Sequence, residues 1–147
     1  MRAIGLLLAL SLAMPMTAMA DGAAVYAKHC VACHQPGAVG APGLAPPLAG
    51  NIGQAAASDP GKRYLASVVL HGLSGPIEVD GVRYQSVMKS FGAALTDDEV
   101  VDVLGHLLRD IEAVPNTDWL TPTYVAGVRA AGGSPGENHK LRGKLPK

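Results

Sequence analysis

Two cysteines and a histidine stand at a spacing that suits covalent attachment of a haem. Cys30, Cys33 and His34 form a C-x-x-C-H run, which is the attachment pattern of c-type haem. Two thiols three positions apart can each add to one vinyl group of a haem and form a thioether bond. The imidazole of the next residue then falls beneath the iron as its proximal ligand. The sequence therefore predicts one haem c, bound covalently through Cys30 and Cys33, with His34 as an iron ligand.

Two other uses of a cysteine pair stay open at this point. A structural zinc site needs four nitrogen or sulfur ligands, and the chain has no second cysteine pair to complete one. A thioredoxin-like redox pair occurs next to a βαβ pattern, which the flanking sequence does not show. Both fit the sequence less well than covalent haem does.

A six-coordinate electron-transfer haem needs a second axial ligand, usually methionine or histidine. Four of the five methionines precede residue 20, so Met88 is the only methionine after it. Polar residues (Ser86, Lys89 and Ser90) flank Met88, which is unlike the setting of a methionine that fills a gap in a core. We therefore predict that Met88 is the distal ligand. The alternative is a bis-histidine haem through His71, although that residue also suits the C-terminal end of a helix.

The first twenty residues have the features of a secretory signal peptide. Arg2 gives a positive start, an apolar run follows over residues 4–12, and an A-x-A cleavage site ends at Ala20. An uncleaved anchor is the alternative, but the run is well short of the ~20 residues that a membrane span requires. We expect cleavage after Ala20 and export to the periplasm as a one-domain protein that begins at Asp21.

The charge balance argues against a nucleic-acid partner. The chain carries 12 basic and 12 acidic residues, so its net charge is near zero. Only 4% of the residues are aromatic. A small domain with so few large rings benefits from a flat apolar haem in its core.

Helix signals recur along the chain. Asp21 can cap a helix over residues 22–33, and Asp59 can cap one that ends at Gly72. Thr96 and Glu99 form a capping box, and apolar residues then follow helical spacing to residue 108.

The segments between and after these helices carry turn signals. Glycine and proline are dense over residues 35–47, and Asp80-Gly81 predicts a small hairpin. Thr121-Pro122 can open a short helix, and residues 132–147 are basic and polar, which predicts a mobile tail.

With these residues in place, the sequence resembles the class I c-type cytochromes, which hold a single haem. Residues 21–34 resemble the first helix of that family with its attachment motif. Residues 46–50 (Pro-Pro-Leu-Ala-Gly) resemble the proline loop, and residues 88–99 resemble the methionine loop and the start of the last helix. The resemblance implies an all-α cytochrome c fold, with three to four helices around one covalently bound haem. The cytochrome c domain would span residues 21–112, and a partly irregular C-terminal extension would span residues 113–147.

The resemblance also implies roles for individual residues around the haem. The Pro46 carbonyl would accept a hydrogen bond from the His34 ring, which fixes the ring and tunes the iron. Leu48 would pack on the haem.

Two positions match the helix crossing of the family, and two depart from its pattern. Gly22 and Tyr26 correspond to positions where the first helix crosses the last. Lys89 stands where proline often follows the methionine, and His106 stands where an aromatic residue is usual.

The function that the resemblance implies is one-electron carriage, without catalysis by the chain itself. Residues 69–76, 79–84 and 119–129 are similar to cytochrome subunits and partners of periplasmic dehydrogenases and reductases. The partners would be a donor dehydrogenase or a terminal reductase or oxidase, and the haem-attachment machinery during maturation. The alternatives are a cytochrome subunit of a periplasmic oxidoreductase complex, and a haem enzyme or sensor with an open or bis-histidine site. Met88 argues against the open site, because a strong distal ligand closes the iron.

Overall fold

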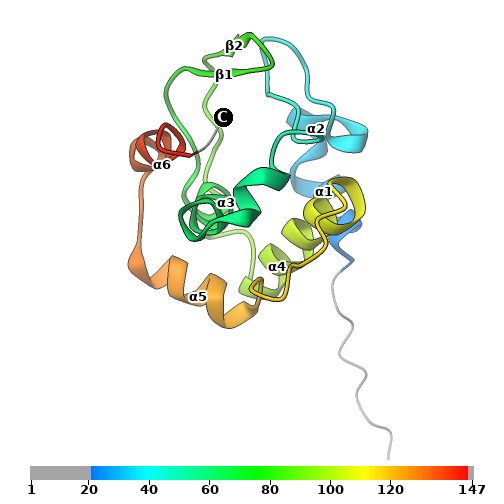
Figure 1. Ribbon diagram of the computed structural model, residues 1–147, viewed down its shortest axis with the longest axis vertical. Helices are drawn as coiled ribbons and strands as arrows, with labels where there is room; N and C mark the ends of the chain where they lie inside the picture. The colour runs from blue at the N-terminus through cyan, green and yellow to red at the C-terminus, as the bar shows by residue number, and fades with distance from the viewer. Residues whose placement is uncertain (1–20, 146–147) are drawn as a thin grey trace, which may run out of the picture.

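The computed structural model describes residues 21–145, and this part of the chain is mainly helical with a two-stranded hairpin (Figure 1). Its elements are α1 (Gly22–His29), α2 (Val31–His34), η1 (Pro36–Ala38), η2 (Gly53–Ala57), α3 (Asp59–His71), β1 (Ile77–Val79), β2 (Val82–Tyr84), α4 (Asp97–Gly105), η3 (His106–Ile111), α5 (Pro122–Ala131) and α6 (Pro135–Arg142). This arrangement confirms the all-α fold class. The predicted signal peptide and its cleavage site lie outside the described residues. No helix within residues 21–145 is long and apolar enough to cross a membrane.

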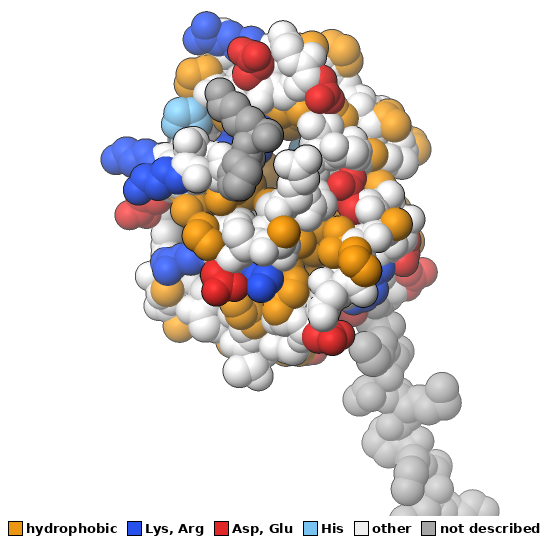
Figure 2. Space-filling model, in the orientation of Figure 1, with side chains coloured by type: hydrophobic (Ala, Val, Ile, Leu, Met, Phe, Trp, Pro, Cys, Tyr) orange, Lys and Arg blue, Asp and Glu red, His pale blue; other side chains and the backbone are white. Residues whose placement is uncertain are grey.

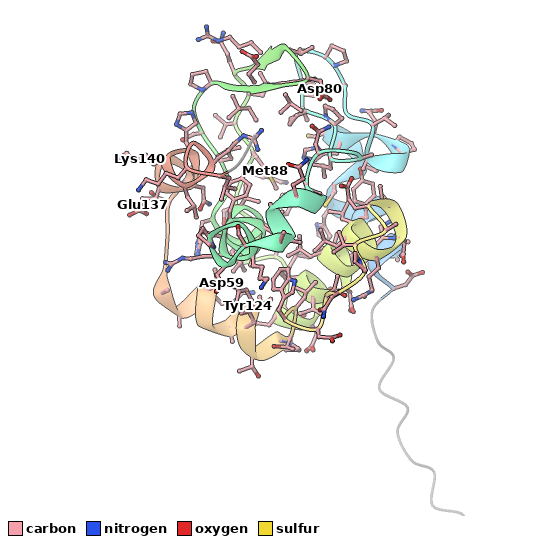
Figure 3. All side chains as sticks on the ribbon, viewed as in Figure 1. Asp59, Asp80, Met88, Tyr124, Glu137 and Lys140 are labelled. Atoms are coloured by element: carbon pink, nitrogen blue, oxygen red, sulfur yellow. The ribbon has the colours of Figure 1, made fainter. Side chains whose placement is uncertain are left out.

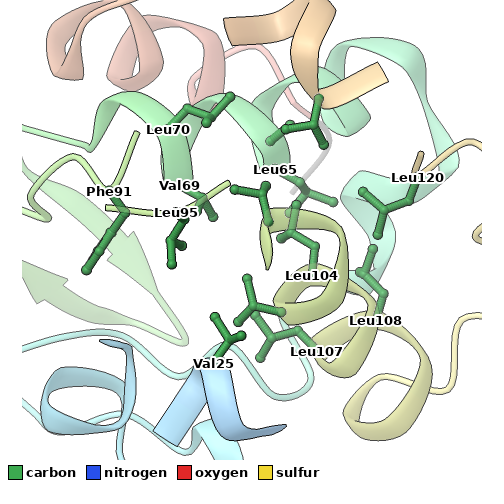
Figure 4. Close-up of a cluster of buried hydrophobic side chains, with 14 of the residues drawn as sticks. Val25, Leu65, Val69, Leu70, Phe91, Leu95, Leu104, Leu107, Leu108 and Leu120 are labelled. Carbon is green, nitrogen blue, oxygen red and sulfur yellow. The ribbon is translucent and has the colours of Figure 1, made fainter. Parts of the chain in front are cut away.

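The core lies where α1, α3 and the α4–η3 segment meet. Leu65 and Leu70 of α3, Leu104 of α4 and Leu108 of η3 are each at most 2% exposed and belong to one cluster (Figure 4). Full burial of one such side chain stabilises the fold by about 1.5–3 kcal/mol. The helical spacing read from the sequence therefore marks the face that is buried.

The start of α4 confirms the predicted capping box. The Glu99 backbone N–H donates to the Thr96 hydroxyl over 3.2 Å, and the Thr96 N–H donates to the Glu99 carboxylate over 2.8 Å. The helix does not end at residue 108. It passes at Gly105 into the π-helical turn η3, which His106 and Asp110 bridge by a side-chain contact of 2.8 Å.

The first helix is divided, whereas the sequence predicts one helix over residues 22–33. Asp21 caps α1 as expected, with its carboxylate accepting from the Ala23 N–H over 3.0 Å. At Cys30 the backbone leaves ideal helical geometry, with φ −117°, and α2 then continues to His34. The Tyr26 hydroxyl donates to the Gln35 carbonyl over 2.7 Å, so α1 also holds the end of α2.

The cap of α3 lies one residue earlier than predicted. The Ser58 hydroxyl accepts from the Gly61 N–H over 3.2 Å, and Asp59 is already the first helical residue. At the other end Gly72 has φ 80°, a left-handed conformation that stops the helix.

The predicted turn at Asp80-Gly81 joins β1 to β2 as an antiparallel hairpin. Both turn residues have positive φ (51° and 75°), as a two-residue hairpin turn of this kind requires. The hairpin covers one side of the molecule beyond α3 (Figure 1).

The C-terminal extension is more ordered than the sequence predicts. The short helix expected after Thr121 is present as α5, and Arg129 ties it to α4 through a 2.8 Å ion pair with Asp97. Within the segment predicted to be a mobile tail (residues 132–147), residues 135–142 form the helix α6. Ser134 caps α6, and Asn138, only 2% exposed, anchors it on α3.

Candidate haem site

A cavity of about 420 Å³ lies among α2, the proline loop, α3, the hairpin and α4. This volume falls within the roughly 300–1,000 Å³ that is usual for sites of small molecules and cofactors. Most of its wall is apolar. All six site residues predicted from the sequence line it, namely Cys30, Cys33, His34, Pro46, Leu48 and Met88.

The His34 ring is fixed in the orientation and protonation state that an iron ligand needs. The side chain is 7% exposed, and Nδ1 lies 2.9 Å from the Pro46 carbonyl oxygen. A carbonyl can only accept, so Nδ1 carries the proton and Nε2 carries the lone pair. Burial lowers the pKa of His34, which favours the neutral ring, while the hydrogen bond to Pro46 opposes this shift. The contact that the family resemblance implies is therefore present.

Backbone hydrogen bonds hold the Pro46 carbonyl in place. The Gly40 N–H donates to the His34 carbonyl over 2.8 Å, and the Leu48 N–H donates to the Ala38 carbonyl over 2.8 Å. Gly40 has φ 69°, and a side chain there would collide with the backbone of Pro46 and its neighbours. This close approach explains the glycine and proline density that the sequence shows.

The two thiols face the same cavity and are not joined by a disulfide. Burial raises the pKa of the Cys30 thiol to about 11, and the neighbouring Cys33 adds to the shift. Redox-active C-x-x-C pairs instead contain a thiol whose pKa is lowered, because the thiolate is the reactive form. The environment of Cys30 therefore differs from that of a redox-active C-x-x-C pair.

Met88 reaches the cavity from a different part of the chain. Its backbone N–H and C=O both pair with Leu73, each over 2.9 Å, just beyond the end of α3. Gly72 makes this pairing possible, because a side chain there would overlap the Met88 carbonyl. Figure 3 draws Met88 in the space between α3 and the hairpin, whereas His34 comes from α2.

The histidine alternatives differ in position. His71, the alternative ligand, is not part of the described cavity wall, and its buried Nε2 has no hydrogen-bond partner within residues 21–145. His29 lines the cavity, where its ring meets the edge of Phe91 with centroids 6.0 Å apart. The Lys89 ammonium lies 5.1 Å from the centre of the same Phe91 ring.

Tyr64 and Arg142 are among the polar residues of the cavity wall that sequence reasoning missed. Tyr64 comes from α3, and Arg142 comes from the last turn of α6. No motif links them, because 78 positions separate them and α6 lies in the segment expected to be mobile. A capping pattern at Ser134 and Glu137 was the one available signal that a helix there could bring Arg142 inward.

Comparisons with known proteins agree with this site. The family model described as "Cytochrome C oxidase, cbb3-type, subunit III" matches residues 17–107. A curated relative named cytochrome c-552, from Thermus thermophilus, is 49% identical over 90 residues, which are 61% of this chain and 60% of the relative. A second cytochrome c-552 from the same species is 49% identical over 88 residues, which are 60% of this chain and 66% of the relative. The aligned part thus spans less than two thirds of either relative, and it supports covalent haem c as the group that the cavity holds.

Proposed function

We propose that this chain, which belongs to the c-type cytochrome family whose model matches residues 17–107, is a one-electron carrier. Bound haem supplies the chemistry, because its iron cycles between the ferrous and ferric states. The observation that best supports the proposal is that His34 and Met88 line one largely apolar cavity from separate parts of the chain. Imidazole and thioether are the ligand pair of cytochromes c, and this pair raises the reduction potential.

In this proposal the side chains orient ligands and exclude water, and none of them moves a proton. Pro46 holds the His34 ring with Nε2 free for the iron. Leu48, Leu104 and similar apolar residues on the wall keep the local dielectric low. A low dielectric and few mobile waters limit reorganisation when the charge of the iron changes.

Met88 supports a carrier over an enzyme or gas sensor. An enzyme or sensor with an open iron needs a free position for its substrate or gas, and a distal thioether would close that position. The paired backbone of Leu73 and Met88 gives the methionine a fixed approach to the cavity. We therefore assign the distal position to Met88 and leave no open site.

Substitution of Met88 tests the ligand assignment. The oxidised protein should show the weak long-wavelength absorption band of iron–methionine ligation, and Met88→Ala should abolish the band and allow carbon monoxide to bind. Met88→His should keep a six-coordinate haem and lower its potential, because a thioether favours ferrous iron more than an imidazole does. Val87→Ala, at a neighbouring residue that is 69% exposed, is the matched control and should keep the band. An unchanged spectrum in Met88→Ala would contradict the assignment.

The partner class is a redox protein that docks near the cavity. Two apolar side chains beside the cavity are unusually exposed: Val87 (69%) and Leu44 (45%). If a permanent partner covers them, the chain is a subunit of an oxidoreductase complex, which is the second candidate function. Size-exclusion chromatography of the native protein separates the two: a carrier elutes alone, whereas a subunit elutes with its enzyme.

The location we propose is the periplasm. The signal features over residues 1–20 support it, and so does covalent haem c, since the attachment machinery works on exported chains. In this location the donor would be a dehydrogenase and the acceptor a reductase or oxidase.

A further inference from the structure

Hydrogen bonds hold α6, the last helix of residues 21–145, against α3, which forms part of the wall of the haem cavity. The Asn138 amide of α6 donates to the Ser67 carbonyl over 3.0 Å and to the Gly72 carbonyl over 2.7 Å, and its oxygen accepts from the Ser67 hydroxyl over 2.7 Å. One residue later, the His139 ring contacts the Pro76 carbonyl over 2.7 Å. These contacts fix α6 against α3 and the segment that leads to β1.

The anchored face of α6 delivers Arg142 to the cavity. Asn138 and Arg142 are four residues apart, so they share one face of the helix. Arg142 is half-buried and lines the cavity beside Tyr64, which is 6% exposed. Burial raises the pKa of Tyr64, and the nearby Arg142 guanidinium opposes this shift.

The guanidinium has no carboxylate partner among residues 21–145. Its hydrogen bond to the backbone is at the limit of length, with Nη2 3.5 Å from the Glu78 carbonyl oxygen, and its other neighbour is the Tyr64 hydroxyl, which is not a carboxylate. A guanidinium offers five N–H donors, and a charge that leaves bulk water is usually paired. Lys89, which also lines the cavity, already lies over the Phe91 ring.

Haem carries anions that suit this end of the cavity. Its two propionates lie at the edge of the ring opposite the vinyl groups that react with cysteine. Thioether bonds to Cys30 and Cys33 therefore direct the propionates away from α2. Figure 1 shows α2 and α6 on opposite sides of the hairpin and α3.

We infer that Arg142 and Tyr64 bind a haem propionate, so that the C-terminal helix forms part of the haem site. This inference rests on the proposed haem function. It assigns haem binding to α6, which lies in the segment that the sequence analysis predicts to be a mobile tail. The arginine fork matches a carboxylate in two parallel hydrogen bonds, and the tyrosine hydroxyl can donate a third. The positive charge also favours the ferrous state, because reduction removes one positive charge from the iron.

Removal of this charge gives a measurable shift. For a unit charge roughly 10–15 Å from the iron and an effective dielectric constant of about 20, Arg142→Gln should lower the equilibrium constant for haem reduction about tenfold. Lys140→Gln removes the same charge from an exposed residue of α6, and Figure 3 shows Lys140 at the outer edge of that helix. In the same orientation, Figure 2 shows several Lys and Arg side chains at that edge of the surface, next to an acidic one. Solvent screens that position, so Lys140→Gln should change the constant less than twofold.

Spectroelectrochemistry of the holoproteins gives these potentials, and redox-induced infrared difference spectra test the contact itself. The propionate carboxylate bands should shift in Arg142→Gln and stay unchanged in Lys140→Gln. Tyr64→Phe keeps the ring packing and removes one donor, so it should shift the same bands, and it is the second variant if Arg142→Gln holds haem poorly. Two results together would overturn the inference. The first is that the carboxylate bands stay unchanged in Tyr64→Phe. The second is that either the potential or the carboxylate bands stay unchanged in Arg142→Gln.

The same measurements separate this inference from the proposed function. Absence of the iron–methionine band from the wild-type spectrum is the sign that methionine ligation is wrong, and neither Arg142 nor Tyr64 contributes to that band. A wild-type protein without the band but with shifted carboxylate bands in Arg142→Gln would refute methionine ligation and support the propionate contact.

Discussion

Gly22 lies where α1 crosses α4, and one added carbon there should push the two helices apart. A Cβ built on Gly22 would overlap the Asp102 carbonyl oxygen, 2.8 Å from its carbonyl carbon and 2.9 Å from the His106 Cβ. Carbon atoms in contact are normally about 3.5–4.0 Å apart. The helices would have to separate by roughly 0.7 Å or more, and the obstacle is backbone, which cannot rotate away as a side chain can.

The cost of Gly22→Ala follows from the packing that this separation disturbs. Tyr26, 4% exposed, packs beside His106 with ring centroids 5.9 Å apart, and Val25 is 6% exposed. Overpacking of this kind costs about 1–3 kcal/mol. We expect about 2 kcal/mol, which in a domain of this size lowers the melting temperature by roughly 8 °C.

Thermal unfolding of the holoprotein, followed by far-ultraviolet circular dichroism, measures the change. Gly127→Ala is the matched control, because Gly127 lies inside α5 with no atom near its missing side chain. Alanine is the better helix former by ~1 kcal/mol, so this control should melt slightly higher than the wild type. If Gly22→Ala melts at or above the wild-type temperature, the helix crossing described above is wrong.

Two further predictions concern the ends of the chain. Asn138→Ala should reduce the free energy of unfolding by about 2–3 kcal/mol in denaturant titrations, because it leaves the buried partners of Asn138 without hydrogen bonds. Asn116→Ala, at an exposed residue, is its control. Equal stability of the two variants would show that α6 contributes little to the stability of the fold. N-terminal sequencing of the native protein should begin at Asp21, and a retained Met1 would favour an uncleaved anchor.

The candidate site residues could be predicted from the sequence because their chemistry is local or rare. Cys30, Cys33 and His34 lie within about one helical turn of each other, so their spacing alone defines the geometry of haem attachment. Met88 could be singled out because no other methionine follows residue 20. All four of these residues line one cavity, although only folding brings Met88 to the other three.

The break at Cys30 shows what a helical pattern leaves undetermined. Residues 22–33 contain no proline, and no glycine after the first position, so local preference gives no reason to interrupt the helix. Tertiary contacts explain the break: α1 crosses α4 at Gly22, while α2 directs the His34 ring toward the Pro46 carbonyl. One straight helix would have to satisfy both contacts with a single axis.

The sequence contains a capping pattern at the start of α6, but the polar residues that follow it gave no hydrophobic periodicity to support a helix. Ser134 and Glu137 form the same S/T-x-x-E pattern as Thr96 and Glu99, and in both pairs the hydroxyl accepts from the N–H of the glutamate. The pattern predicts a helix after Thr96 because leucines and valines follow it. After Ser134 the residues that follow are polar, and α6 is held by the amide of Asn138 instead of an apolar stripe. Hydrophobic periodicity cannot detect a helix that is anchored by hydrogen bonds, and for that reason the polar end of the haem cavity was absent from the sequence prediction.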